Sequence, residues 1–137
     1  ASIHEYFSGI PFGFLLGIKP GAFGPGWCHA QMPIREELLQ QTGVVHAGAL
    51  ASLADQTAAA AAITLLPEDK TVVSLEFNIN LLAPAQGELL NCEARVLKPG
   101  RSILVSEAEI FVTPGRSPTD RLLVCKLNQT LYVIDKT

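Results

Sequence analysis

The sequence predicts an α+β domain in which a curved antiparallel β-sheet is wrapped around one long central helix. Three observations lead to this prediction: a single run of small apolar residues long enough for a buried helix, later segments with an apolar residue at every second position, and short turns rich in Gly and Pro between those segments. A strand with one apolar face needs one covering layer, and a single long helix can supply it.

Length and composition fit one domain over residues 1–137. Hydrophobic residues make up 48% of the chain and charged residues 17%, which excludes intrinsic disorder and indicates that a second copy covers part of the apolar surface. The formal net charge is −3, and the ten Lys and Arg residues form no stripe. We therefore expect no nucleic-acid partner.

The segments before the helix are short. Residues 4–10 predict one helical turn, which Pro11 ends. Residues 13–33 predict two extended pieces on either side of a Gly- and Pro-rich bend at residues 20–26. Residues 34–41 predict a polar connector with one helical turn. The chain therefore makes two extended pieces before it reaches the helix.

The central helix is predicted from about Ala47 to Leu66, where Pro67 ends it. Four strands should follow, at residues 72–82, 88–97, 102–112 and 122–134. Because the connecting turns are short, we expect each of these strands to pair antiparallel with the next. An exposed hairpin loop at residues 113–121 joins the last two. The first strand should carry one apolar face, formed by Val73, Leu75, Phe77, Ile79 and Leu81.

The spacing of the cysteines argues against a metal site, and the composition of the helix argues against a membrane span. Cys28, Cys92 and Cys125 are odd in number and widely spaced, which predicts reduced thiols in a cytoplasmic protein and no structural zinc site. Residues 47–66 are long enough to span a bilayer, but alanine inserts weakly and Asp55 costs about 2.5–3.5 kcal/mol near its centre. The start ASIHEYFSGI lacks the features of a signal peptide. We expect no metal and no membrane partner.

Asp55 is a carboxylate in the middle of the helix, and no Lys or Arg lies in the same helix. A buried carboxylate without a partner is unstable, and proteins keep such groups mostly where they line a cavity and react. On the residues alone, two interpretations stay open. Asp55 is either a catalytic carboxylate or part of a polar strip with Ser52 and Gln56 that faces solvent.

The start of the helix, at residues 43–48, is a second candidate site. If the helix begins near Ala47, its first N–H groups lack partners and the macrodipole adds positive charge there. Such a position suits an oxyanion or a polarised carbonyl, and Gly48 permits close approach to the backbone. The alternative is an ordinary helix start with His46 as the cap residue.

The helical rise separates the two candidate sites by about 12–13 Å. A carbonyl carbon held at Ala47 therefore cannot touch Asp55 of the same chain. If both groups act on one bond, a second subunit must supply one of them. This geometry predicts a dimer with a shared site.

These residues carry a resemblance to a known family. Gln40, six residues before His46, is followed by HAGALASLAD at residues 46–55, VVSLEFN at 72–78 and LAPA at 82–85. Over nearly its whole length the chain resembles the hotdog-fold thioesterases of the PaaI type, which are similar to the hydroxybenzoyl-CoA thioesterases. The resemblance implies a hotdog fold, hydrolysis of an acyl-CoA or acyl-carrier-protein thioester, no cofactor besides the CoA of the substrate, and homodimers that often pair into homotetramers.

The resemblance also implies roles for single residues. Asp55 would be the general base for water or the nucleophile, and the Ala47 N–H would polarise the thioester carbonyl. Gln40 would place the water or the thioester, His46 would fix the turn, and Ser74 would hydrogen-bond near the carboxylate. Family members supply Gln40 and Ala47 from one subunit, and Asp55 and Ser74 from the other.

The chain departs from the family pattern at two positions. The family usually has two glycines after the histidine, whereas here Ala47 precedes Gly48, and its methyl group narrows the approach of the acyl group. Gln40 stands where many members have asparagine, so the reach of its amide differs. Asp55 follows the pattern without change.

The CoA-binding residues predicted are Arg101, Lys98 and Asn78. Arg101 follows Pro99-Gly100 in a strand turn where similar proteins often place a basic residue, and Lys98 is next to that turn. The alternative is that these are solvated turn charges, which are common on surfaces.

The sequence therefore predicts an acyl-CoA thioesterase. Three alternatives remain: a non-catalytic acyl-CoA-binding or sensing module, a hotdog dehydratase or hydratase, and a purely structural dimer. A dehydratase needs a paired His and carboxylate for which no second motif occurs, and a structural dimer leaves Asp55 unexplained. A Ser-His-Asp hydrolase is excluded because the chain has no G-x-S-x-G motif.

Overall fold

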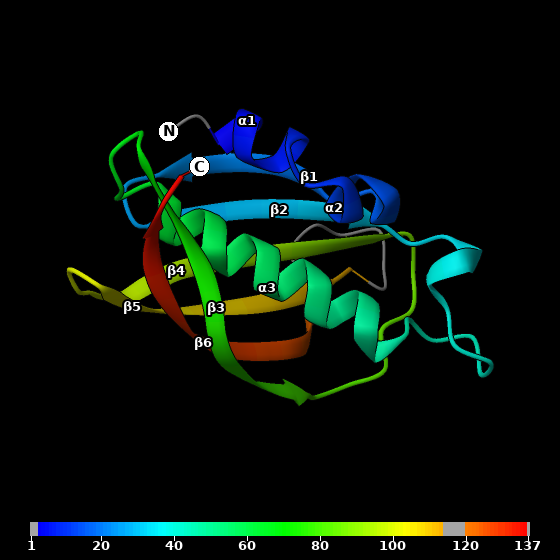
Figure 1. The fold of residues 1–137 in the computed structure, drawn as a ribbon. Coiled ribbons are helices and arrows are strands. Elements are labelled where there is room, and N and C mark those ends of the chain that lie inside the picture. The colour runs from blue at the N-terminus through cyan, green and yellow to red at the C-terminus, as the bar shows by residue number, and fades with distance from the viewer. Residues whose placement is uncertain (1–2, 114–119, 137) are drawn as a thin grey trace.

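One long helix lies against a curved, six-stranded antiparallel sheet, as Figure 1 shows. The computed structural model describes residues 3–113 and 120–136. The long helix is α3 (Ala47–Ile63), and it is preceded by α1 (Ile3–Ser8), α2 (Pro11–Leu16) and the 3₁₀ turn η1 (Glu36–Leu38). The strands follow across the sheet in the order β1 (Lys19–Gly24), β2 (Trp27–Pro33), β4 (Leu89–Pro99), β5 (Ile103–Val112), β6 (Leu122–Asp135) and β3 (Lys70–Leu81). The predicted α+β architecture is confirmed.

Helix α3 begins as predicted and ends three residues early. His46 is its N-cap, and the helix ends at Ile63 rather than Leu66. The N–H groups of Leu65 and Leu66 bond to carbonyls three residues back, which tightens the last turn. The Thr64 hydroxyl donates to the Ala61 carbonyl at 2.6 Å and accepts the Gly26 N–H at 2.7 Å, which ties this end to the β1–β2 turn.

The core lies between α3 and the sheet. The alanines of α3 supply much of it, and side chains this small let the sheet approach the helix backbone closely; completely buried are Ala54, Ala58, Ala60, Ala61 and Ala62. Larger fully buried side chains fill the remaining space, among them Met32, Leu53, Leu90 and Leu127. The three cysteines are free and buried, as predicted, and burial raises the pKa of Cys28 to about 12 and that of Cys125 to about 11.

The prediction that all four later strands pair with their chain neighbours is wrong for β3. Strand β3 pairs with β6, and residues 82–88 carry the chain past the start of α3 to β4, which pairs with β2 and β5. This connection is bonded to other loops: the Ala85 carbonyl accepts the Val45 N–H at 2.9 Å, and the Glu88 carbonyl accepts the Ile34 N–H at 2.8 Å. Strand β3 is therefore an edge strand. The predicted loop at 113–121 lies mostly outside the described residues.

The first predicted extended piece is also partly wrong. Pro11 does not end a helix but begins α2, because proline fits the first helical position, where its missing N–H has no partner to lose. Gly17 ends α2 with a φ of 84°, a conformation that glycine adopts without strain. The helical turn at residues 4–10 and the turn within 34–41 are confirmed as α1 and η1.

Candidate active site

Asp55 lies midway along α3 and faces the strands β3 and β6. Its carboxylate accepts a hydrogen bond from the Ser74 hydroxyl at 2.8 Å and another from Nε2 of Gln129. The Asp55 side chain is half-buried, whereas Gln56 beside it is buried, so the alternative of a solvent-facing strip with Gln56 is wrong. The carboxylate thus has two donors that hold it in one place and a side open to solvent.

A β-bulge aims Ser74 at Asp55. The pairing of β3 with β6 slips between Ser74 and Glu76, and Leu75 is the extra residue. Ser74 is opposite the fully buried Leu131, on the inner face, while Val73 is opposite the exposed Tyr132. The single apolar face predicted for this strand is therefore wrong, because the bulge shifts the alternation by one residue. Bulges commonly re-aim a side chain beside a functional site.

Gln129 is a site residue that sequence reasoning missed. It lies in β6, it is 1% exposed, and its Nε2 donates to Ser74 Oγ at 2.9 Å as well as to Asp55. A signal was present: Leu127, Gln129 and Leu131 form one inward row, and a glutamine inside an apolar row is unusual.

Tyr6 brings α1 to the same place. Burial of its ring raises the pKa of the Tyr6 hydroxyl well above its ordinary value, and the negative charge of Asp55 raises it further. Tyr6 also packs edge-on against Phe7, with ring centroids 5.8 Å apart.

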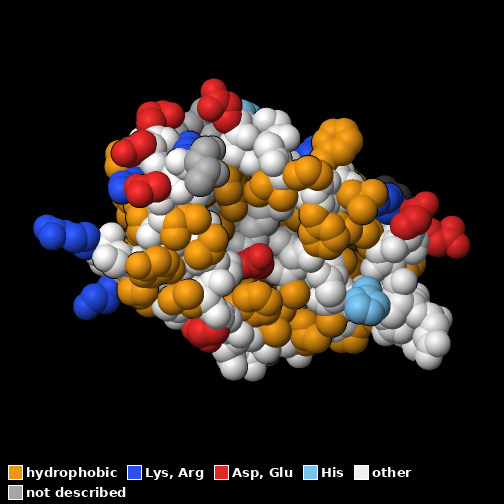
Figure 2. Space-filling view, viewed as in Figure 1, with side chains coloured by type: hydrophobic (Ala, Val, Ile, Leu, Met, Phe, Trp, Pro, Cys, Tyr) orange, Lys and Arg blue, Asp and Glu red, His pale blue; other side chains and the backbone are white. Residues whose placement is uncertain are grey.

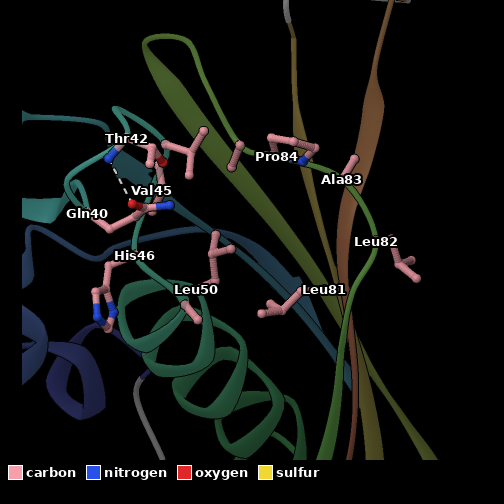
Figure 3. A pocket seen from close by; sticks show the side chains of 12 residues that line it. Gln40, Thr42, Val45, His46, Leu50, Leu81, Leu82, Ala83 and Pro84 are labelled. Carbon is pink, nitrogen blue, oxygen red and sulfur yellow. Dashed lines mark hydrogen bonds between the residues drawn. The ribbon is translucent and has the colours of Figure 1, made fainter.

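A cavity of about 630 Å³ opens at the start of α3. Figure 3 shows Gln40 and His46 on one side and the stretch from Leu81 to Pro84 on the other. Ala47 lines the cavity, and its backbone N–H donates to none of the residues in the two described ranges. The helix start therefore offers a donor, with the positive end of the helix dipole behind it.

His46 and Gly48 form the cap of this helix. The His46 Nδ1 accepts the Gly48 N–H at 2.8 Å, and a Cβ at Gly48 would lie 3.1 Å from that nitrogen. The cap therefore favours glycine at this position. It also uses the Gly48 N–H, which leaves Ala47 as the donor that faces the cavity.

Gln40 points its amide at the same cavity. Its Oε1 accepts the Thr42 N–H at 2.8 Å, and its backbone closes a loop through bonds to Val44 and Gly43. Figure 3 shows the amide nitrogen on the far side from Thr42, above Leu50. Gln40 thus presents a second donor beside Ala47.

The structure does not bring the two candidate sites of one chain together. Ala47 is the first residue of the helix and Asp55 lies two turns later, about 12 Å along the axis. The cavity at Ala47 does not include Asp55, Ser74 or Gln129 among its lining residues. A single chain therefore holds the donor and the carboxylate as separate halves.

The predicted CoA-binding residues are exposed, and the two basic ones, Lys98 and Arg101, are far from the cavity of the same chain. Strand β4 starts beside the cavity and has 11 residues, a rise of about 36 Å. Lys98 near its end and Arg101 in the next turn lie at the opposite end of the sheet, as Figure 1 shows for the β4–β5 turn. Asn78 is exposed on β3 opposite Asn128, and its Oδ1 accepts a bond from Asn80.

An apolar surface surrounds the Asp55 side of α3. Figure 2 shows hydrophobic side chains spread over this face, with an acidic group in their middle. The edge strand also exposes apolar side chains, and Leu75, Phe77 and Leu81 are each between 42% and 55% exposed. Exposed apolar side chains that gather on one face commonly mark an interaction surface.

The described residues hold no group of three or more His, Cys, Asp and Glu that could bind a metal ion. Within those same ranges, α3 and the other helices are too short or too polar to cross a bilayer.

Comparison with known proteins identifies the family. Residues 42–119 match the thioesterase superfamily, and the chain belongs to it. A thioesterase from Haemophilus influenzae is 35% identical, with 88% of this chain and 80% of that chain covered and a TM-score of 0.77. A thioesterase family protein from Silicibacter pomeroyi is 29% identical over 98% of this chain and 96% of that chain, with a TM-score of 0.91. A 1,4-dihydroxy-2-naphthoyl-CoA hydrolase from Listeria monocytogenes is 30% identical over 69% of this chain and 77% of its own length.

The predicted hotdog fold and the resemblance to thioesterases are thereby confirmed. The PaaI protein of Escherichia coli shares the fold at 22% identity, with a TM-score of 0.84 over 98% of this chain and 91% of that one. The protein is accordingly a thioester hydrolase of the hotdog class.

Proposed function

We propose that the protein hydrolyses acyl-CoA thioesters in a site that two copies of the chain share. One copy supplies Asp55, Ser74 and Gln129, and the other supplies the Ala47 N–H and Gln40. One observation carries the proposal. Helix α3 holds both an oriented carboxylate, Asp55, and an unused N–H, at Ala47. Within one chain these two groups are too far apart to act on the same bond.

The edge strand supports the dimer. Strand β3 ends the sheet, so one side of its backbone is unpaired, and an unpaired edge is a template for another strand. A second copy that covers the exposed apolar side chains of β3 would remove them from water, which favours association. Antiparallel pairing of two β3 strands about a two-fold axis would set the two α3 helices in opposite directions. Asp55 of each copy would then approach the helix start of the other.

The same arrangement supports a CoA-binding role for the basic turn. With the helices opposed, the β4–β5 turn of one copy lies at the end where the second copy has its cavity. Lys98 and Arg101 would there meet the phosphates of CoA, as charged partners of an anionic group. Asn78 on the neighbouring edge strand stays a candidate for the polar part of CoA. The name of the Listeria relative, a CoA-thioester hydrolase, favours CoA as the carrier. We expect pairs of dimers to associate further.

Each half of the shared site has its own role in the reaction. The Ala47 N–H and the dipole of α3 stabilise the negative charge that develops on the carbonyl oxygen. Asp55 takes a proton from water while the water oxygen attacks the carbonyl carbon. The C–S bond then breaks, and the proton on Asp55 passes to the leaving thiolate, which releases CoA and the carboxylic acid. In the alternative, Asp55 attacks the carbon itself, and water then cleaves the mixed anhydride. Gln40 holds the water or the thioester oxygen.

Thiol release from short, long and aryl acyl-CoAs tests the proposal. Asp55→Asn keeps the shape of the side chain and removes its basicity, so kcat should fall by at least ~100-fold. The matched control is Asp135→Asn, which changes an aspartate paired with Lys70 at the sheet end and should leave kcat within ~2-fold, because surface ion pairs contribute little.

Two outcomes would contradict the proposal. Tight binding of acyl-CoA without turnover of any ester would favour the non-catalytic binding module. Full activity in Asp55→Asn would remove the carboxylate from the mechanism.

A single turnover in ¹⁸O water then separates the two mechanisms, because label in Asp55 would show that this residue is the nucleophile.

A further inference from the structure

Gln129 is the most completely buried polar side chain that touches Asp55. Its side chain comes from the centre of β6, is 1% exposed, and approaches α3 from the sheet side. Ser74, its neighbour in the cluster, lies on the exposed edge strand, and Asp55 is half-buried. Gln129 is therefore the member of the three whose position is fixed by packing.

The amide nitrogen of Gln129 lies within donating distance of two side-chain oxygens. Its Nε2 donates to the Asp55 carboxylate and, at 2.9 Å, to the Ser74 oxygen, while Ser74 donates its own proton to Asp55 at 2.8 Å. Because a hydroxyl that accepts on one side donates on the other, the Gln129 bond directs the Ser74 proton toward the carboxylate. The three side chains form a closed triangle of hydrogen bonds.

The orientation of the amide is set by the charge of Asp55. If the amide were turned over, Oε1 would face the carboxylate oxygen and repel it. In the orientation present, Oε1 points away, is buried, and has no partner among the described residues. A buried acceptor without a partner destabilises the fold, so the arrangement persists only because the bonds to Asp55 and Ser74 outweigh this cost.

Ser106 offers an internal comparison. It lies directly opposite Gln129 in the pairing of β5 with β6, on the same inner face, and its side chain is fully buried. Its hydroxyl has no partner in the part of the chain that is described, and it makes no bond to Asp55. Ser106 thus shares the burial and the face of Gln129 without the contact to the carboxylate.

We propose that Gln129 is a positioning residue for catalysis: its amide fixes the direction of the Asp55 carboxylate and of the Ser74 proton, so that one carboxylate oxygen stays free to act on the substrate side. This inference rests on the proposed thioesterase function for its kinetic consequence. The hydrogen-bond triangle itself is independent of that function.

The kinetic test uses Gln129→Met, which keeps the length of the side chain and removes both donors. A carboxylate that is no longer held loses reactivity but not affinity for the substrate, so kcat should fall ~10–100-fold with KM within ~2-fold. In the Asp55→Asn background, Gln129→Met should reduce the residual rate by less than ~2-fold, because the group it positions has already lost its function. Two controls, Ser106→Ala and Leu127→Met, change the same inner face and should leave kcat unchanged.

The second measurement does not need turnover. In the ¹⁵N–¹H spectrum, the side-chain amide of Gln129 should show a proton shifted downfield by the charged acceptor, and that shift should be lost in Asp55→Asn and kept in Ser106→Ala. If the wild type hydrolyses no acyl-CoA, the proposed function fails while this spectrum still decides the role of Gln129.

Any of three results would overturn the inference. A wild-type kcat in Gln129→Met would show that catalysis does not need the amide. An equal loss in the Asp55→Asn background would show that Gln129 acts through general stability. An amide resonance of Gln129 that Asp55→Asn does not change would show that the amide does not donate to the carboxylate.

Discussion

The two functional regions of α3 differ in what each one lacks. Around Asp55, in the middle of α3, the chain provides a carboxylate with its donors, Ser74 and Gln129, whereas the N–H groups of a helix interior are bonded within the helix. At the helix start it provides the free Ala47 N–H, the dipole and the amide of Gln40, and among the described residues no carboxylate lines the cavity. Hydrolysis of a thioester needs both a base and a stabilised oxyanion.

The surroundings of the two regions differ in the same way. The helix start opens into a cavity that the chain builds by itself, with the connection after β3 as its far wall. The Asp55 region is bordered by the edge strand and by exposed apolar side chains. The chain thus forms all the walls of the cavity at the helix start, whereas the Asp55 region has an exposed apolar border that a second copy could cover. The difference supports the proposal that dimerisation completes the site.

The largest effect is expected from Ala47→Pro. Proline fits the first helical position, and His46 before it already has φ −63° and ψ 139°, which a following proline requires. The change therefore removes one N–H and keeps the helix. We expect kcat to fall by about 10²–10³, the usual loss for one oxyanion donor, with an unchanged circular dichroism spectrum. Ala47→Gly keeps the N–H and is the control, with kcat within ~3-fold of wild type.

Leu75→Lys tests the open region. Leu75 is 55% exposed on the edge strand, so a charge there leaves the single chain intact but opposes pairing with another strand. Sedimentation should show a shift toward monomer, and activity should fall with it, in proportion to the dimer that remains. A monomer that kept full activity would contradict the shared site.

The smallest effect concerns Glu107, a buried charge on the outer face of the sheet. Burial raises the pKa of its carboxyl, but hydrogen bonds from Lys126, at 2.6 Å, and from Arg95 outweigh burial and hold the pKa below its ordinary value. A carboxylate with a lowered pKa stabilises the fold above the pKa of the unfolded chain, and this stabilisation is lost as the pH falls through the folded pKa.

Glu107→Gln should therefore lower the free energy of unfolding at pH 7 by about 1–3 kcal/mol. The difference from wild type should narrow in urea titrations at acidic pH, as the pH falls from the ordinary glutamate pKa of about 4.3 through the lowered pKa of the folded protein. The kcat should stay unchanged, because the residue lies on the face away from α3. An equal destabilisation at both pH values would show that packing rather than charge is responsible.

Much of the fold could be predicted from local patterns. The start of α3 follows from His46 and the alanine run, and the antiparallel pairing of β4 with β5 follows from the short turn between them. The position of β3 could not be predicted the same way, because residues 82–88 are long enough to pass over the helix and bond to other loops. Pairing across the sheet is a long-range property that chain order does not contain.

The site was predictable where one segment carries it. Asp55, His46 and Ala47 sit on one helix and could be found together. Ser74 reaches the inner face only through the bulge at Leu75, and nothing in the alternating pattern of that strand announces a bulge. Gln129 comes from the last strand, 74 residues from Asp55 in the chain, and only its polar character in an apolar row marks it.

Mixing two inactive variants tests the shared site most directly. Asp55→Asn and Ala47→Pro are each unfolded, combined and refolded, and their mixed dimers are assayed for thiol release. In a mixed dimer, one site combines the native Asp55 of one copy with the native Ala47 of the other, while the second site has both defects. Random association should therefore restore about one quarter of wild-type activity. Activity that stays at the level of the separate variants would show that Asp55 and Ala47 do not act on one substrate across the interface.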